Sequence, residues 1–106
     1  MIYELRIYYM HPGRMDAINK RFSTATLDLF KKHGVKVTDF WVDAQGSEKL
    51  YYVVEYESLE DREKKWGAFA NDPEWIKAKA ASEKDAPIVE KVETFYMKRA
   101  PYFKGE

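Results

Sequence analysis

The first ten residues alternate between apolar and polar or charged positions. This period of two predicts a β-strand over residues 2–10. One face of the strand would carry Tyr3, Leu5, Ile7 and Tyr9, and the other face Glu4, Arg6 and Tyr8. The following His11-Pro12-Gly13 breaks the pattern and ends the strand.

Apolar residues then recur at spacings of three and four, which places them along one side of a helix. The stripe consists of Met15, Ile18, Phe22, Ala25 and Leu29. Gly34 is suited to ending this helix, because glycine readily adopts the left-handed conformation that follows a helix C-terminus. We therefore expect a first helix that stops at Gly34.

Two further runs are rich in β-branched and aromatic residues and predict strands over residues 35–42 and 50–56. The polar turn at residues 43–47 is short enough to join them as a hairpin. A last run with strand character covers residues 88–98. The faces of this last strand mix apolar and charged residues, so it cannot be oriented from its pattern.

A second helix is predicted between the third and fourth strands. Ser58 followed by Asp61 is a variant of the capping box and marks its start. Asp72 followed by Pro73 is a second start signal, because aspartate caps a helix and proline suits the first helical position. We therefore expect a break at this point and a short helix that runs to about Ser82.

The resulting order, β-α-β-β-α-β, predicts an α+β fold of the ferredoxin-like kind: a four-stranded antiparallel sheet with both helices on one face. At 106 residues, the chain has the length of one domain. We expect residues 1–106 to form it, with a core over about 2–98 and a C-terminal tail over 99–106. The other face of the sheet would remain uncovered.

Composition narrows the classes of function. Lysine plus arginine equals aspartate plus glutamate at 18 each, so no net charge attracts nucleic acid or anionic lipid. No apolar run has the length of a membrane helix, and the chain opens on a strand pattern instead of a signal peptide. The absence of cysteine excludes disulfides and thiolate chemistry. We expect a cytoplasmic protein with no nucleic-acid or membrane partner.

Three segments of the chain resemble the NIPSNAP family. The opening of NIPSNAP domains is similar to Tyr3-Glu4-Leu5-Arg6, Tyr8 and Pro12-Gly13, and their second signature to Glu55-Tyr56-Glu57-Ser58-Leu59, Arg62 and Asp72-Pro73-Glu74-Trp75. Phe40-Trp41, after a helix ending in Lys32-His33-Gly34, resembles the middle segment. The resemblance runs from Ile2 to about Phe103.

This resemblance implies a dimeric α+β barrel, in which the helix-free faces of two sheets pack against each other. The expected partner is therefore a second copy of the chain. The wider superfamily includes small monooxygenases, haem-degrading enzymes and isomerases, whereas NIPSNAP members mostly lack an assigned reaction. The implied role is that of a homodimer whose biochemical function is unassigned.

Charged side chains need partners when they are buried, so we assign the charged face of each strand to the helix-free side of the sheet. That surface would hold Glu4, Arg6, Tyr8, Asp39, Trp41, Tyr51, Val53 and Glu55. The first and third strands are central neighbours in a ferredoxin-like sheet. Arg6 is therefore expected near Glu55 or Glu4.

These residues support two hypotheses. In the first, the charges pair across the dimer interface, and the barrel serves assembly or holds a small-molecule ligand. In the second, the protein is a cofactor-independent enzyme, monooxygenase-like or isomerase-like, with Arg6, Glu55 and Tyr51 as candidate catalytic residues. Arg6 would bind an anionic or carbonyl group, Glu55 or Glu4 would move a proton, and the aromatic side chains would stack on a planar ligand.

No cofactor is expected. Neither His11 nor His33 has a second ligand at metal-binding spacing, and no glycine-rich loop follows a strand. We therefore expect no metal, haem or flavin. Trp66 and Trp75 are interpreted as packing residues and not as a ligand cage.

Overall fold

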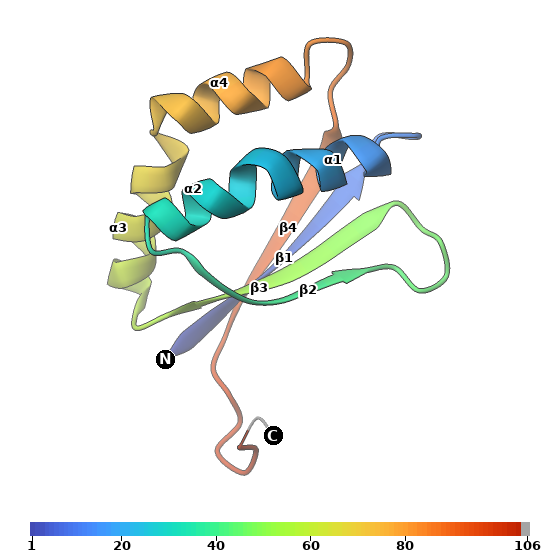
Figure 1. Cartoon of the computed structure of the whole chain (residues 1–106). Helices are drawn as coiled ribbons and strands as arrows, with labels where there is room; N and C mark the ends of the chain where they lie inside the picture. The colour runs from blue at the N-terminus through green and yellow to red at the C-terminus, as the bar shows by residue number, and fades with distance from the viewer. Residues whose placement is uncertain (105–106) are drawn as a thin grey trace.

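The computed structural model describes residues 1–104 and contains one four-stranded sheet and a layer of helices (Figure 1). The last two residues of the predicted tail lie outside the described part. The elements are, in chain order, β1 (Ile2–Met10), α1 (Met15–Arg21), η1 (Phe22–Thr26), α2 (Leu27–Lys32), β2 (Lys36–Val42), β3 (Lys49–Tyr56), α3 (Leu59–Ala70), α4 (Pro73–Ser82) and β4 (Val89–Met97). The predicted α+β, ferredoxin-like order is confirmed.

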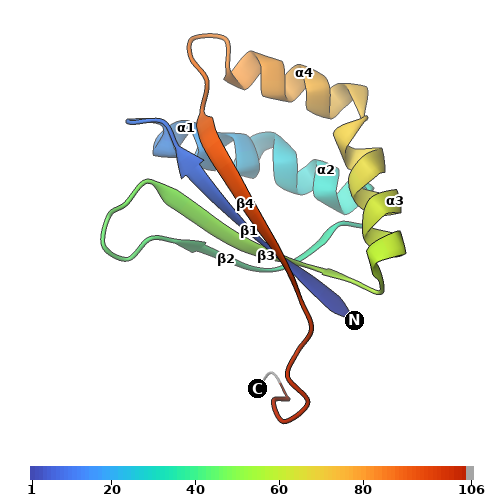
Figure 2. The same ribbon diagram turned by 180° about the vertical axis from the view of Figure 1, so that it is seen from behind.

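The strands lie in the order β2-β3-β1-β4, and every neighbouring pair is antiparallel. The central strands β1 and β3 pair in a continuous register that sets Arg6 opposite Tyr52 and Glu4 opposite Val54. Residues opposite each other in a sheet point to the same side. Figure 2, which turns the molecule to its other side, shows β4 as the edge strand beside β1.

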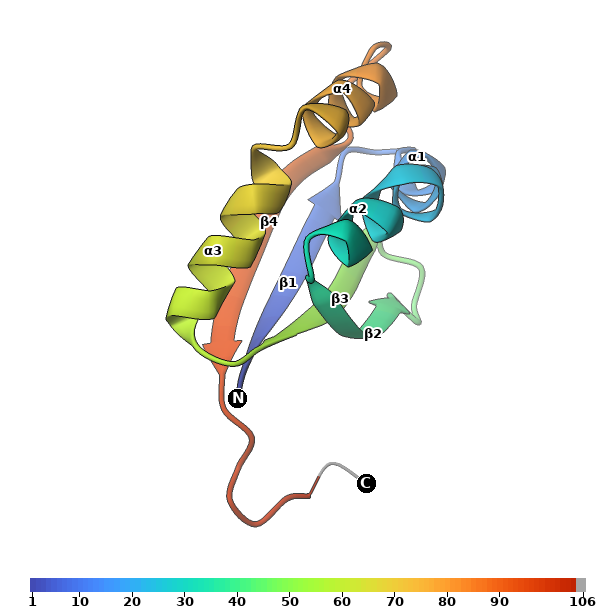
Figure 3. The same cartoon turned by 60° about the vertical axis from the view of Figure 1, so that its left-hand side comes forward.

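All helices lie on one side of the sheet, as Figure 3 shows most clearly. We call the side beneath them the covered face; on β1 and β3 it carries Ile2, Glu4, Arg6, Tyr8, Met10, Leu50, Tyr52, Val54 and Tyr56, all of which are buried. The opposite side is the open face; it carries Tyr3, Leu5, Ile7, Tyr9, Tyr51, Val53 and Glu55, which are half-buried. Within residues 1–104, every helix is too short or too polar to span a lipid bilayer.

The predicted helix boundaries follow from their capping residues. The Ser58 side chain accepts a hydrogen bond from the Asp61 amide, and the Asp72 side chain accepts one from the Glu74 amide. Pro73 occupies the first turn of α4, so the expected break between α3 and α4 is confirmed. Gly34 follows α2 with a φ of +73°, a left-handed conformation that favours glycine.

The first helix departs from its predicted pattern. A π-helical turn, η1, separates α1 from α2. It buries Thr26, whose hydroxyl donates to the carbonyl of Arg21 five residues earlier, and leaves Ala25 only half-buried. The regular spacing in the sequence had assigned Ala25 to the buried stripe, and the wider turn moves that position by one residue.

Candidate functional site

The structure corrects the face assignment of the first strand. Glu4, Arg6 and Tyr8 lie on the covered face, between the sheet and the helices, and not on the helix-free side. The expectation that they share a surface with Glu55 is therefore wrong. Of the two predicted neighbours of Arg6, Glu4 is in contact, at 2.9 Å between Nη1 and Oε2, and Glu55 lies on the opposite face.

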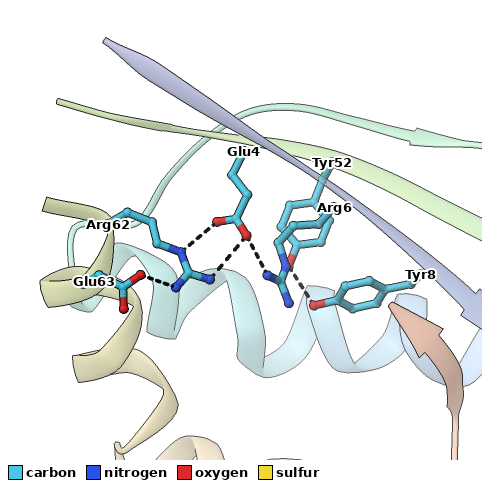
Figure 4. A network of polar contacts seen from close by, with 6 residues as sticks. All are labelled: Glu4, Arg6, Tyr8, Tyr52, Arg62 and Glu63. Atoms are coloured by element: carbon cyan, nitrogen blue, oxygen red, sulfur yellow. Dashed lines mark hydrogen bonds and ion pairs between the residues drawn. The ribbon is translucent and has the colours of Figure 1, made fainter. Parts of the chain in front are cut away.

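Glu4 can be buried because two guanidinium groups surround its carboxylate (Figure 4). Arg62 of α3 approaches Glu4 Oε1 through Nε at 3.1 Å and Oε2 through Nη2 at 3.3 Å, and Arg6 donates to Oε2. The Glu4 side chain is 0% exposed. A buried carboxylate with this many charged donors has most of its lost hydration replaced. The sequence rule failed because the partner, Arg62, comes from a distant helix.

Arg6 is held in one position by four neighbours. Its Nη1 donates to Glu4, its Nε donates to the Tyr52 hydroxyl at 2.9 Å, and its guanidinium carbon lies 4.2 Å from the centre of the Trp66 ring and 5.6 Å from that of Tyr8. Burial opposes the charge, but the Tyr52 and Tyr8 side chains and Glu4 outweigh it and raise the pKa of Arg6 above its usual value. Arg6 is therefore a fixed cation.

The other predicted site residues lie on the open face and form separate surface contacts. Glu55 pairs with Lys36 at 2.9 Å, and Lys36 lowers the pKa of Glu55. Tyr51 donates to Asp43 at 3.3 Å. Asp39 and Trp41 are exposed on β2 and align with Val53 and Tyr51 in the ladder. Asp39, Trp41, Tyr51 and Glu55 are thus separated from Arg6 by the sheet.

A cavity of about 370 Å³ lies on the covered face. Its aromatic walls are Tyr8, Phe22, Phe30, Trp66, Phe69 and Trp75, and its charged lining consists of Arg6, Arg21, Lys79, Lys91, Glu83 and Glu90. Both arginines are buried, whereas Lys79 and Glu90 are exposed and mark the mouth of the cavity between α4 and β4. The Lys91 side chain lies on the open face instead, with its Nζ 5.2 Å from the centre of the Tyr9 ring. Cations outnumber anions in this lining.

Arg21 is the second buried cation of the cavity. Its Nη1 donates to the Ser82 hydroxyl at 3.2 Å and lies 3.6 Å from Glu83, and its guanidinium carbon lies 5.2 Å from the centre of the Trp75 ring. Burial lowers the pKa of Arg21, in spite of Glu83. Among the described residues, no acceptor pairs with its buried Nε–H. A buried donor without a partner costs free energy, which a ligand oxygen would recover.

Sequence reasoning did not assign Arg21, Tyr52 or Arg62 to the site. One signal was present for Arg21, because it lies three residues after Ile18 and beside Phe22, inside the apolar stripe of the first helix. A charged residue at such a position must find partners inside the fold. Tyr52 had the alternation of its strand as a signal, since it falls between Leu50 and Val54. Arg62 entered only through the NIPSNAP-like signature, because it lies within a run of charges typical of a solvated helix surface.

Trp66, Trp75 and His33 make packing and polar contacts between the helices. Trp66 and Trp75 both pack on Phe69, with ring centres 5.2 and 4.7 Å apart, and both also line the cavity. His33 contacts Asp72 at 2.7 Å and so connects the end of α2 to the start of α4. Within residues 1–104, no group of three or more histidine, aspartate or glutamate residues is placed to hold a metal ion.

Known structures with the same architecture include several NIPSNAP proteins. An uncharacterized NIPSNAP domain protein from Burkholderia xenovorans has a TM-score of 0.83 and 17% identity, covering 97% of this chain and 98% of its own. A NIPSNAP family protein of unknown function from Agrobacterium tumefaciens has a TM-score of 0.85 and 23% identity, with coverages of 98% and 92%. At these identities, the likeness establishes the fold alone.

A more distant structure shares the fold as well. A protein from Nitrosomonas europaea described as a putative antibiotic biosynthesis monooxygenase has a TM-score of 0.66 and 10% identity, covering 93% of this chain and 98% of its own. No curated protein matches the sequence. The sequence profile of the NIPSNAP family, in contrast, matches residues 3–104. The chain therefore belongs to the NIPSNAP family.

Proposed function

We propose that this NIPSNAP protein binds a small, planar organic anion in the cavity of the covered face. The observation that carries the proposal is the pair of buried arginines, Arg6 and Arg21, that line a cavity with aromatic walls. The volume of about 370 Å³ lies within the range of roughly 300–1,000 Å³ that small-molecule sites occupy.

Arg21 is the residue that would contact the anion. Arg6 already has Glu4 and Tyr52 as partners, whereas the Nε–H of Arg21 has none in the described part of the chain. A carboxylate can accept from an arginine through two parallel hydrogen bonds, which makes the pair both strong and directional. The rings of Phe22 and Trp75 would cover the flat faces of the ligand.

Calorimetry with benzoate and benzamide tests this function, because the two probes share their shape and differ in charge. We expect benzoate to bind at least about tenfold more tightly, which corresponds to a difference of about 1.4 kcal/mol. Arg21→Met should remove most of that preference. Lys77→Met, an exposed cation of α4 outside the cavity lining, is the matched control and should leave binding unchanged. Equal affinity for the two probes would contradict the proposal.

We also propose that the protein is a homodimer formed through the open face. This face exposes large apolar side chains that the helices do not cover, among them Trp41, Phe95 and Met97, which are 51%, 48% and 38% exposed. The half-buried Leu5, Ile7 and Val53 continue the same surface across the centre of the sheet. An apolar surface that spans a whole sheet favours association with a second copy over exposure to water.

Light scattering on the purified protein tests the assembly: a mass of two chains at micromolar concentration is expected, and a monomer would refute it. The ligand site is separate from this surface, so binding and assembly can be measured independently. The cytoplasmic location expected from the sequence remains a prediction, which fractionation of cells would test.

A further inference from the structure

The cavity contains a chain of hydrogen bonds that starts at a buried cation. Arg6 Nε donates to the Tyr52 hydroxyl at 2.9 Å, and the hydroxyls of Tyr52 and Tyr8 lie 2.7 Å apart (Figure 4). Arginine has donors only, so the Tyr52 oxygen must be the acceptor of the first bond. The direction of the second bond depends on where the Tyr52 proton can go.

Burial decides this direction. Tyr52 is 0% exposed and does not line the cavity. Within residues 1–104, the only acceptor at hydrogen-bond distance from its hydroxyl is the Tyr8 oxygen. A buried hydroxyl that fails to donate loses free energy, so Tyr52 donates to Tyr8. Tyr8 does line the cavity, and its own proton is left for a group inside it.

Each donor along this chain strengthens the next one. A hydroxyl that accepts from a cation becomes a better donor, because successive hydrogen bonds polarise one another in a medium of low dielectric. Burial, together with Tyr8, raises the pKa of Tyr52 well above its usual value, so Tyr52 remains a protonated donor at neutral pH. The positive charge of Arg6 thus polarises the Tyr8 hydroxyl, which lines the same cavity as Arg6.

We propose that the cavity binds a planar phenol or enol in its ionised form, with the Tyr8 hydroxyl donating to the oxyanion and with Tyr52 and Arg6 as positioning residues. This inference rests on the proposed function and names the group that its ligand presents to β1. An oxyanion is the acceptor that gains most from a donor polarised by a cation. The rings of Phe22 and Tyr8 are tilted by 47° with their centres 6.0 Å apart, and both line the cavity, where an aromatic or conjugated ring would contact them.

Absorbance of p-nitrophenol, whose ionised form absorbs visible light, measures the protonation state of a bound phenol directly. Titration of the probe at saturating protein concentration should give a pKa lower than in buffer by roughly one unit, the shift expected for a hydrogen bond that favours the phenolate about tenfold. The probe p-nitroanisole has the same ring but no ionisable hydrogen. Its affinity reports the packing contribution alone.

Tyr8→Phe removes the terminal donor and keeps the ring. This variant should bring the pKa of bound p-nitrophenol back toward its value in buffer and weaken phenolate binding about tenfold, with p-nitroanisole unaffected. Tyr52→Phe interrupts the chain and should give part of the same loss while Tyr8 remains in place. Tyr51→Phe is the matched control: Tyr51 lies next to Tyr52 on β3 but on the open face, so this variant should behave as wild type.

Each outcome separates the two proposals. If benzoate binds and depends on Arg21 but the pKa of bound p-nitrophenol is unshifted, the inference about Tyr8 fails and the anion site stands. If the shift is present and survives Tyr8→Phe, Tyr8 is not the donor and the inference fails as well. If neither benzoate nor p-nitrophenol binds to the folded protein, the cavity is not a ligand site and both proposals fall. Thermal melts establish that each variant is folded.

Discussion

The two faces of the central strands carry similar kinds of residues and use them in opposite ways. On the covered face, Glu4 and Arg6 are buried in a network that also includes Arg62, Tyr52 and Tyr8. On the open face, Glu55 contacts Lys36 and Tyr3, Tyr51 contacts Asp43, and apolar side chains remain uncovered. Charge is therefore no guide to which face of this sheet is buried. What matters is whether another element supplies a partner.

This contrast predicts different consequences for mutations on the two faces. Removing a group from the covered face leaves its partners buried and unpaired, so it should reduce folding stability. A change on the open face should leave the single chain folded and alter only what binds to it. The following predictions test the contrast, beginning with the largest effect.

Glu4→Gln should have the largest effect on stability. It keeps the shape of the side chain but leaves the guanidinium groups of Arg6 and Arg62 without their shared carboxylate. Breaking a buried ion pair from one side typically costs about 3–5 kcal/mol, and we expect a loss of that order in the free energy of unfolding. Urea denaturation measures it.

Glu63→Gln is the control for this variant. Glu63 contacts the same Arg62 at 3.0 Å, but its side chain is 73% exposed. Exposed ion pairs contribute about 0–1 kcal/mol, so the control should unfold almost as wild type does. Equal losses in both variants would show that burial of Glu4 does not set the strength of the network.

Phe95→Asp should affect assembly and leave folding nearly unchanged. Phe95 lies on β4 opposite Leu5 and is 48% exposed in the single chain. A carboxylate within the proposed interface would be desolvated without a partner, so we expect the dimer to weaken at least about tenfold, or about 1.4 kcal/mol. Sedimentation at several concentrations measures the change. A dimer of unaltered strength would place the interface elsewhere.

Ser58→Ala probes the covered face through the helix that supplies Arg62. The Ser58 hydroxyl caps α3 at the Asp61 amide, and Arg62 follows in the next position. Loss of an N-cap costs about 1 kcal/mol, which should lower the melting temperature by several degrees for a domain of this size. Calorimetry of the variant tests this. A loss as large as that of Glu4→Gln would mean that the start of α3 holds the whole network in place.

The smallest effect should come from Asp72→Asn and should depend on pH. The His33 and Lys32 side chains lower the pKa of Asp72, with His33 the larger cause. A carboxyl whose pKa is depressed by folding adds stability above its unfolded pKa of about 3.9 and loses it as the pH falls toward the folded value. Asparagine keeps an oxygen at the N-cap, so only the charge is removed.

Thermal melts at several pH values test the direction of this pH dependence. Wild type should be more stable than Asp72→Asn at pH 7, and the difference should shrink as the pH falls below about 4. A difference that grows in acid would contradict the assignment of the charge to Asp72. Asp72 and His33 lie in the helix layer and on neither face of the sheet. The effect of the variant therefore measures how much a contact between helices contributes to stability.

The sequence predicted the strands and helices well because these depend on local patterns. The alternation of Ile2–Met10 and the caps at Ser58 and Asp72 act within a few residues, and the structure confirms them. The orientation of the first strand depended on Arg62, a residue 58 positions from Glu4. A long-range contact of this kind leaves no periodicity in either segment.

The candidate site was predicted only in its residue types. Arg6 and Tyr8 were named as candidate site residues, and both line the cavity, but their predicted location on the helix-free side was wrong. Arg21 joins them because it lies on the buried side of α1 with Ile18, and its partner Ser82 lies 61 positions along the chain, where no local pattern reveals it. Whether these residues act on a ligand stays a prediction that the binding experiments address.

The π-helical turn has a consequence for how the length of this chain can change. Such a turn holds one residue more than an α-helix needs over the same rise, and each residue of an α-helix rotates the chain by about 100°. Deleting one residue between Phe22 and Thr26 would therefore give an uninterrupted helix in which α1 and α2 keep their present faces. Arg21 would still point to the cavity. A deletion inside α1 or α2, in contrast, would rotate one part of the helix by about 100° and turn its buried side away from the sheet.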